Sequence, residues 1–266
     1  YINENALFRG QWQFRRGRRN EEEFTAIIEQ QARPVYNELK LLCKREQLLQ
    51  PKVVYGYFPC QSDGDDLIVY RPVARTHEAL YGIWNEIPIC HLHSGDVPLV
   101  EWVRFRFPRQ REGKFLCIAD FFRPVETGQY DVVAFHVVTI GARATPYAQE
   151  LFQTGRYRDY LFFHGLSVES AEGLAEYWHK IIRAELGIAQ RDAPTLKELF
   201  VQGYQGSRYS FGYPACPNLE DQALIMELLC PERIGISLTE EYELVPEQST
   251  SALICHHPEA RYFNVR

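Results

Sequence analysis

The segment Val103-Arg104-Phe105-Arg106-Phe107 decides the fold class, because its apolar and charged residues alternate strictly. A period of two places the phenylalanines on one face and the arginines on the other, as in an antiparallel strand with one solvated face. Four more strands are predicted, over residues 53–58, 67–70, 114–122 and 131–140. The first two flank a turn at Asp63-Gly64 and are expected to form a hairpin. The sequence therefore predicts a mainly antiparallel sheet in the middle of the chain.

Helical patterns lie on both sides of these strands. Asn20 precedes three glutamates, which predicts an N-cap and either two consecutive helices or one kinked helix to about Leu49, with the break at Pro34. Capping residues predict four further helix starts, at Thr145, Ser167, Thr195 and Asn218. Gly187 ends the second of these and Leu229 the last. This grouping predicts an α+β fold, with residues 1–266 as a single domain.

Composition and charge narrow the functional classes. The 266 residues are 45% hydrophobic and 24% charged, which excludes a disordered chain, and the net charge of −6 argues against a nucleic-acid-binding surface. No apolar run approaches the roughly 18 residues of a membrane span. Seven cysteines, an odd number, do not predict a disulfide framework, so we expect free thiols and a cytoplasmic protein. Because the chain starts at Tyr1 and its one methionine is Met226, we expect a piece of a longer protein.

Common catalytic and metal signatures are missing. The sequence has no dinucleotide-binding glycine motif, no P-loop and no Gly-x-Ser-x-Gly elbow. Cys90-His91-Leu92-His93 and Cys255-His256-His257 contain metal-ligating residue types, but their spacing does not match that of known zinc sites. We predict no metal site and no catalytic residue, and expect surface histidines beside core thiols.

The segment from Gly206 to Pro217 is the best candidate for chemistry, and its prolines and glycines predict an irregular loop. Arg208 has a planar guanidinium suited to a carboxylate or phosphate, and Gly212 allows close approach of a ligand. Tyr209 and Tyr213 have flat faces for a ring or a cation. These residues predict a small anionic or zwitterionic ligand. The alternative is a structural loop in which Arg208 pairs with a neighbouring acid.

Arg208-x-x-x-Gly212-Tyr213 followed by Pro214-Ala215-Cys216-Pro217 resembles the signature of the C-terminal activation domain of cobalamin-dependent methionine synthases. The resemblance covers essentially the whole chain. Its supporting segments are Tyr1-Ile2, Gly64-Asp65-Asp66, Ala119-Asp120-Phe121, Ala175-Glu176-Tyr177, Leu238-Thr239-Glu240 and His257-Pro258-Glu259-Ala260-Arg261-Tyr262.

The resemblance implies a C-shaped, helmet-like domain that binds S-adenosylmethionine. In such enzymes, which make methionine from homocysteine and methyltetrahydrofolate, this domain docks over the cobalamin-binding module. An electron from flavodoxin or another flavoprotein and the methyl group of S-adenosylmethionine then restore methylcobalamin from cob(II)alamin. Cobalamin and zinc are bound by other modules of the parent methyltransferase, so this chain alone is not expected to be catalytically complete.

The resemblance also implies eight ligand-binding residues: Asn3, Glu172, Arg208, Ser210, Gly212, Tyr213, Tyr262 and Phe263. Arg208 is carried over as the partner of the ligand's carboxylate. Better-known members of the family have aspartate where this chain has Asn3, so one charge near the ligand's amino group is missing here.

Glu172 shares one helical face with Glu176, His179 and Arg183, a pattern that usually indicates a solvated face. The resemblance instead places Glu172 near the ligand.

Three further hypotheses remain open. One is a docking domain that contacts the cobalamin module without binding a ligand. Another is a hydrolase with Cys216 as nucleophile. The sequence shows no neighbouring acid or histidine that would lower the pKa of this thiol, which argues against the hypothesis. The third concerns partners: the arginines at the start of the chain, together with Arg104 and Arg106, would form a basic face that steers an acidic flavoprotein.

Overall fold

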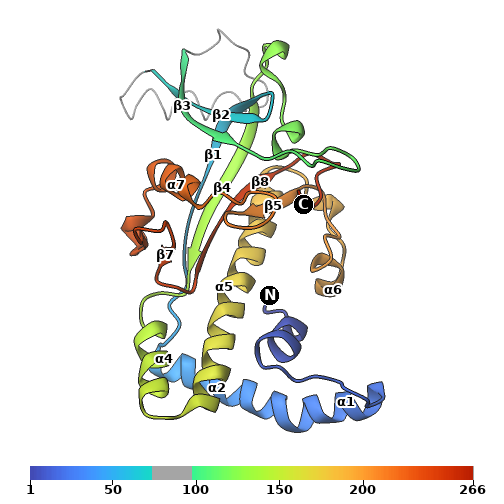
Figure 1. Ribbon diagram of the computed structural model, residues 1–266, viewed down its shortest axis with the longest axis vertical. Coiled ribbons are helices and arrows are strands. Elements are labelled where there is room, and N and C mark those ends of the chain that lie inside the picture. Colours follow the sequence, from blue (N-terminus) through green and yellow to red (C-terminus); the bar gives the residue numbers. More distant parts are fainter. Residues whose placement is uncertain (74–97, 266) are drawn as a thin grey trace. The chain divides into compact units, whose positions relative to one another are not determined.

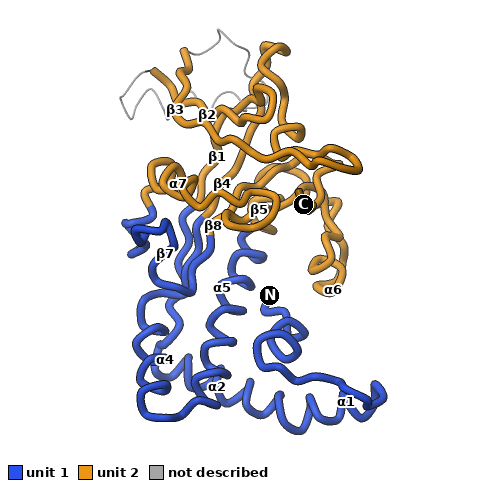
Figure 2. The backbone as a smooth tube through the Cα atoms, viewed as in Figure 1, with its two compact units in different colours: residues 1–54, 137–178, 231–250 blue, residues 55–136, 179–230, 251–266 orange. Residues whose placement is uncertain are grey.

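The computed structural model describes residues 1–73 and 98–265. The chain forms two compact units, each assembled from three segments (Figure 2). Unit 1 comprises residues 1–54, 137–178 and 231–250, and unit 2 comprises residues 55–136, 179–230 and 251–266. The boundary crosses four continuous elements, namely β1 (Lys52–Asp63), β4 (Asp131–Thr139), α5 (Tyr157–Glu185) and β8 (Ser249–Cys255). The assignment of residues 1–266 to a single domain stays a prediction.

Unit 1 is mainly helical, and its first helices confirm the prediction of two consecutive helices or one kinked helix. Its elements are η1 (Ala6–Gln11), α1 (Glu21–Ile27), η2 (Ile28–Ala32), α2 (Arg33–Glu46), α4 (Ala144–Gln153), η8 (Pro231–Ile234), β6 (Ser237–Leu238) and β7 (Leu244–Val245). Asn20 caps α1 in a complete capping box with Glu23. The π-helical turn η2 joins α1 to α2, where Pro34 occupies the first turn. The left-handed residue Gln47 ends α2.

Two predicted helix starts in unit 1 are wrong. Helix α4 begins at Ala144, and the Thr145 hydroxyl donates to the Gln248 side chain instead of capping the helix. Ser167 lies inside the 29-residue helix α5, where its hydroxyl donates to the carbonyl of Phe163 one turn earlier. This internal bond lets serine remain within a helix that the pattern had divided.

The core of unit 1 is apolar and largely aromatic. It joins the first segment of the chain to α2, α4 and α5 through side chains such as Leu7, Phe8, Trp12, Tyr36 and Phe163. The indole nitrogen of Trp12, its polar atom, donates to the carbonyl of Phe162 at 2.9 Å. Burying these side chains supplies the main driving force for folding of this unit.

Unit 2 contains most of a six-stranded sheet with the order β3-β2-β1-β4-β8-β5 (Figure 1). The remaining strands are β2 (Asp66–Pro72), β3 (Leu99–Arg106) and β5 (Ser207–Ser210). The β1–β2, β2–β3 and β5–β8 pairs are antiparallel, and the turn 63–66 closes the predicted hairpin. All nine residues of the central strand β4 are buried. The α+β class with a mainly antiparallel sheet is confirmed.

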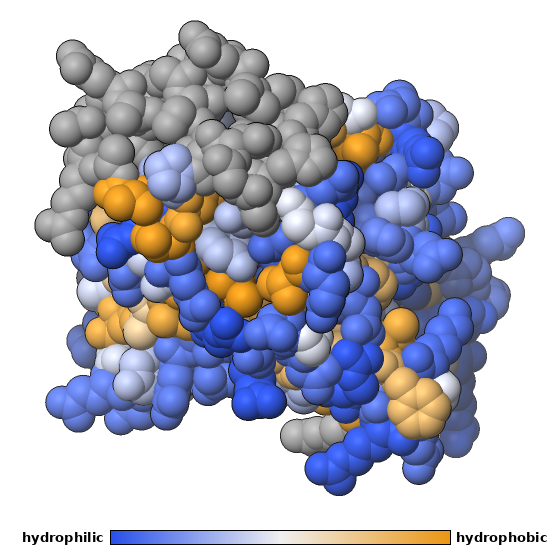
Figure 3. Space-filling view, turned by 90° about the horizontal axis from the view of Figure 1, so that it is seen from above, coloured by the Kyte–Doolittle hydropathy of each residue, from blue (hydrophilic) through white to orange (hydrophobic). Residues whose placement is uncertain are grey.

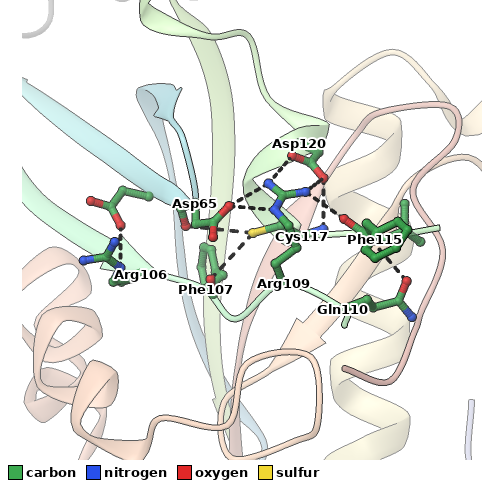
Figure 4. A network of polar contacts seen from close by, with 10 residues as sticks. Asp65, Arg106, Phe107, Arg109, Gln110, Phe115, Cys117 and Asp120 are labelled. Atoms are coloured by element: carbon green, nitrogen blue, oxygen red, sulfur yellow. Dashed lines mark hydrogen bonds and ion pairs between the residues drawn. The ribbon is translucent and has the colours of Figure 1, made fainter. Parts of the chain in front are cut away.

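The predicted strand over residues 114–122 is wrong, because a tight polar network replaces it. Residues 118–121 form the 3-10 turn η4 (Ile118–Phe121), and the Asp120 carboxylate accepts the backbone N–H of Cys117 at 3.0 Å. The guanidinium of Arg109 donates to both Asp120 and Asp65 (Figure 4). These charge-assisted bonds hold the segment beside the β1–β2 hairpin without ladder pairing.

The other helices of unit 2 are short: η5 (Val125–Thr127), η6 (Ala189–Arg191), α6 (Leu196–Leu199), η7 (Leu219–Asp221) and α7 (Gln222–Leu229). Thr195 caps α6 and Asn218 caps η7 as predicted. Gly187, at φ +73°, lies just beyond the last turn of α5, as expected. The predicted loop over residues 203–217 contains strand β5, so Arg208 lies on a strand.

Charge on the β3 surface is compensated locally. The guanidinium of Arg104 pairs with Asp63, Asp66 and Glu101, and Arg106 lies 3.5 Å from Asp66. The expected basic face is therefore interleaved with acids. Hydrophobic residues form small separate patches on the face shown in Figure 3. Within the described ranges, no helix has the length and apolar character that a membrane crossing requires.

Candidate ligand site on strand β5

Arg208 is positioned by edge strand β5 of the sheet. It is registered opposite Ile254 of β8, and Ser210 opposite Ala252, in an antiparallel ladder. The side chain of Arg208 is half-buried, with its Nη1 atom shielded from solvent. The ladder therefore fixes the backbone of Arg208.

A tight turn follows β5 and brings Gly212 and Tyr213 beside it. The backbone N–H of Gly212 donates to the carbonyl of Cys216, and that of Cys216 to the carbonyl of Tyr213, each at 2.9 Å. Gly212 has a φ of +86°, and a Cβ there would lie 2.8 Å from the Leu219 side chain. Glycine is thus required at this position by both conformation and space. The ring of Tyr213 is 53% exposed.

The last residues of the chain complete this surface. Tyr262 stacks on Tyr209 with ring centroids 6.4 Å apart, and its backbone N–H donates to the side chain of Gln202. Burial raises the pKa of Tyr262, and the neighbouring Tyr213 side chain raises it further. Phe263 is buried against Tyr209 and Phe121. Unit 2 therefore brings together six of the eight predicted residues: Arg208, Ser210, Gly212, Tyr213, Tyr262 and Phe263.

One expectation about these aromatic residues needs correction. Tyr209 is completely buried, and its hydroxyl donates to the carbonyl of Arg261 at 2.9 Å. The Tyr209 ring stacks against that of Tyr262, and because it is buried it cannot contact a ligand directly. Tyr262, in contrast, is 44% exposed, so its ring is available as a flat surface.

A buried polar cluster within unit 2 was missed by the sequence reasoning. It consists of His179 and Arg183 on α5 and Asp192, with Tyr204 packed against it; His136 on β4 is a second fully buried histidine of this unit. Nε and Nη2 of Arg183 donate to the two Asp192 carboxylate oxygens, each at 2.9 Å. Burial lowers the pKa of His136 to about 3, and Arg208 lowers it further. Both histidines are therefore neutral at physiological pH.

Comparison with known proteins gives one consistent result. The model of the family described as the activation domain of vitamin B12 dependent methionine synthase matches residues 1–266. The chain belongs to this family.

Two curated relatives extend the match. A methionine synthase of Mycobacterium tuberculosis (strain ATCC 25618 / H37Rv) is 43% identical over 277 residues, which cover 99% of this chain and 21% of the relative. A methionine synthase of Mycobacterium leprae (strain TN) is 40% identical and covers the whole chain. The activation domain thus spans about a fifth of the length of these relatives.

A solved structure supports the same fold. The crystal structure of the MetH reactivation domain bound to AdoHcy matches with a TM-score of 0.77 and 26% identity. The match covers 98% of this activation domain and 76% of that chain.

The two remaining predicted residues, Asn3 and Glu172, belong to unit 1 of the activation domain. The side-chain oxygen of Asn3 accepts the backbone N–H groups of Asn5 and Ala6, each at 3.2 Å. A Cβ on Gly173 would lie 3.0 Å from the backbone nitrogen of Ile2, so the first residues pass directly over α5 next to Glu172. Unit 1 therefore brings Asn3 and Glu172 into one neighbourhood.

The polar face of α5 is buried in the activation domain, which corrects the expectation of a solvated face. Glu176 is 8% exposed, and His179 and Arg183 are fully buried. Helical spacing groups these polar residues on one face but cannot tell whether that face is exposed to solvent or buried. Its burial is set by the tertiary packing of the helix. Glu172 itself is half-buried.

Among the described residues, the surroundings of Cys216 and His256 do not favour a catalytic centre. The Cys216 thiol is 2% exposed, and burial raises its pKa well above the usual range, which disfavours the thiolate that a nucleophile requires. His256 contacts the Asp131 carboxylate at 2.7 Å, and the segment 90–93 lies outside the described residues. Among the residues that the structure describes, no group of histidine, cysteine or acidic side chains could hold a metal ion. That the activation domain binds no metal stays a prediction.

Proposed function

We propose that this activation domain binds S-adenosylmethionine, with Arg208 as the partner of the ligand's carboxylate. The observation that carries the proposal is the position of Arg208, half-buried on an ordered strand of the same unit that exposes the rings of Tyr213 and Tyr262. A guanidinium binds a carboxylate through charge-assisted hydrogen bonds, and flat aromatic faces bind a nucleobase or a sulfonium cation. The related reactivation domain was solved with AdoHcy bound, which supports the same ligand class here.

The resemblance assigns the remaining predicted residues to the other parts of this ligand. Gly212 allows the tight turn that follows β5, and Ser210 offers backbone polar groups at the end of this strand. Glu172 is the acidic partner that we assign to the ligand's ammonium group, with Asn3 nearby as a neutral hydrogen-bonding group. Phe263 supports the surface from below as a buried ring.

In the full-length enzyme, the bound S-adenosylmethionine would donate its methyl group during reductive reactivation and leave as S-adenosylhomocysteine. The cobalamin-binding module of the same enzyme and a flavodoxin or another flavoprotein that donates the electron are the partners we propose. The parent activity is that of a methyltransferase that makes methionine from homocysteine and methyltetrahydrofolate. The curated relatives, which bear the name methionine synthase, support this assignment.

Calorimetric titration of the chain with S-adenosylmethionine tests the proposal. The wild-type chain is expected to bind one equivalent, and Arg208→Ala to lose about 1.5–3 kcal/mol of binding free energy, the typical value of a hydrogen bond to a charged group. Arg106→Ala is the matched control, because Arg106 lies on β3 in the same unit with an 83% exposed side chain.

Circular dichroism must show that both variants keep the wild-type fold. Equal affinities of wild type and Arg208→Ala would remove Arg208 from the site. Complete absence of binding by the wild-type chain would instead favour the docking domain without a ligand of its own.

A further inference from the structure

The peptide group between Arg261 and Tyr262 is held at both ends by side chains of unit 2. Its carbonyl oxygen, that of Arg261, accepts the hydroxyl of Tyr209 at 2.9 Å. Its N–H group, that of Tyr262, donates to the side-chain oxygen of Gln202 at 3.2 Å. Backbone polar groups need partners wherever regular structure does not supply them. Because two side chains supply them here, the plane of this peptide and the start of the Tyr262 side chain are fixed.

Both of these side chains belong to strand β5 or to the residues that lead into it. Tyr209 lies on β5 itself, directly after Arg208. Gln202 precedes the strand, and its amide nitrogen donates to the hydroxyl of Ser207, the first residue of β5, at 3.0 Å. The Gln202 side chain therefore bridges the strand and the backbone of Tyr262. In this way the last residues of the chain are attached to the strand that carries Arg208 (Figure 1).

The rings of the two tyrosines add a second restraint. The Tyr209 ring is completely buried, whereas that of Tyr262 is partly exposed. The two rings stack at an interplanar angle of 26°. The ring of Tyr262 thus has a fixed neighbour as well as a fixed backbone, and its accessible part is ordered without a ligand.

The backbone of Gln202 is strained, which indicates that its side chain has a role. Its φ is +59°, in the left-handed region where residues other than glycine are uncommon. The residue lies just beyond helix α6, where glycine often takes this conformation. Glycine would avoid the strain but would lack the amide that bridges Ser207 and Tyr262. Strain retained beside a binding surface supports a functional role for the residue that bears it.

We propose that Gln202 and Tyr209 are positioning residues that hold the ring of Tyr262 in place for the adenosine of the ligand. This inference rests on the proposed function, which uses that ring as a flat binding surface. Neither residue contacts the ligand in this account, because Tyr209 is buried and the amide of Gln202 is bonded to Ser207 and Tyr262. A ring that is ordered before binding loses less conformational freedom when the ligand arrives, so affinity is higher.

A double-mutant cycle with Tyr262→Ala tests the inference, with S-adenosylhomocysteine titrated into the full chain. Removing the ring should weaken binding at least about tenfold, as the loss of a stacked aromatic side chain implies. Gln202→Met keeps the length of the side chain without its polar groups, and Tyr209→Phe removes only the hydroxyl. Each should weaken binding about three- to tenfold, as the loss of a neutral hydrogen bond implies. In the Tyr262→Ala background, both changes should alter affinity less than about twofold.

Gln205→Met is the matched control, because Gln205 lies on the same connection and its amide nitrogen donates to the carbonyl of His256 at 2.8 Å. It should leave affinity unchanged in both backgrounds. Losses at Gln202 and Tyr209 that are as large without the Tyr262 ring as with it would overturn the inference, since they indicate a general structural role. An equal loss in the control would do the same.

Failure of the inference and failure of the proposed function give different results. If Tyr262→Ala weakens binding while Gln202→Met and Tyr209→Phe bind like the wild type, the inference alone is wrong. If Tyr262→Ala binds S-adenosylhomocysteine as tightly as the wild type, the ring is not part of the site, which contradicts the proposed function at this residue and removes the inference with it.

Hydrogen exchange of the Tyr262 backbone amide, measured by NMR in the ligand-free wild-type chain, provides a test that needs no variant. This amide should be protected, because its N–H donates to Gln202 before a ligand arrives. Exchange of the Tyr262 amide at the rate of an unstructured peptide would overturn the inference.

Discussion

The interiors of the two units are built on different principles. The interior of unit 1 consists of apolar and aromatic side chains, and the buried indole nitrogen of Trp12 donates to the carbonyl of Phe162. Unit 2 buries two histidines and the Arg183–Asp192 ion pair. An apolar core stabilises a fold without specifying chemistry, whereas buried polar groups oppose folding unless they are paired. The comparison indicates that the interior of unit 2 depends on the pairing of polar groups, whereas that of unit 1 depends on apolar packing.

The largest effect is expected from breaking the buried ion pair of unit 2. Asp192→Asn removes the charge that faces the fully buried Arg183, and leaving a buried charge uncompensated costs about 3–5 kcal/mol of unfolding free energy. Asp159→Asn is the control, because its pair with Arg156 is exposed and contributes at most about 1 kcal/mol. Urea unfolding followed by fluorescence measures both. Equal, small losses of unfolding free energy in the two variants would mean that the buried Arg183–Asp192 pair does not stabilise unit 2 more than an exposed pair does.

A pH effect of similar size is expected in unit 1. Burial raises the pKa of Glu169 to about 7, and the charge of Glu172 adds to this rise, although a hydrogen bond from Gln11 opposes it. The folded state therefore favours the protonated carboxyl. This contribution is complete below the unfolded pKa of about 4.5 and is lost as pH rises through 7.

Glu169→Gln should remove that loss and make the protein more stable than the wild type at pH 8, by roughly 3 kcal/mol. At pH 4 the two proteins should be equally stable. Chemical unfolding across this pH range gives the comparison, and parallel pH profiles of the two proteins would be incompatible with a buried, uncharged Glu169.

The smallest effect concerns Asn3. Asn3→Asp adds a second carboxylate near Glu172 while keeping an oxygen that can accept the N–H groups of Asn5 and Ala6. An ion pair in a partly exposed position contributes about 0.2–1 kcal/mol, so affinity for S-adenosylmethionine should rise at most about fivefold and less at high salt. If Asn3→Asp binds no better at low salt and Glu172→Gln also has no effect, the ammonium group lies elsewhere.

Local sequence rules predicted the fold class, strand β3 and several helix starts. Strict alternation at Val103–Phe107 identified β3, and the capping residues Asn20, Thr195 and Asn218 marked real helix starts. Errors arose where tertiary contacts override local preference. Asp120 is drawn into the Arg109 network instead of a strand, and Ser167 satisfies its hydroxyl inside α5.

The eight site residues came from a family resemblance, and composition alone would not have given them. Arg208 was placed on a loop because its flanking glycines and prolines hide a four-residue strand. The buried histidines were missed because His136 sits in a strand whose two faces are both buried, and no periodicity marks such a position. The spacing of His179 and Arg183 was visible, but their burial depends on the sheet packed against them.

A crystal structure of this chain with S-adenosylhomocysteine tests the central claim most directly. We predict that the ligand's carboxylate lies beside the Arg208 guanidinium, with nitrogen–oxygen distances of about 2.7–2.9 Å, and that the adenosine lies near Tyr213 and Tyr262. A ligand whose carboxylate is bound elsewhere, with the Arg208 guanidinium turned away from it, would contradict the account.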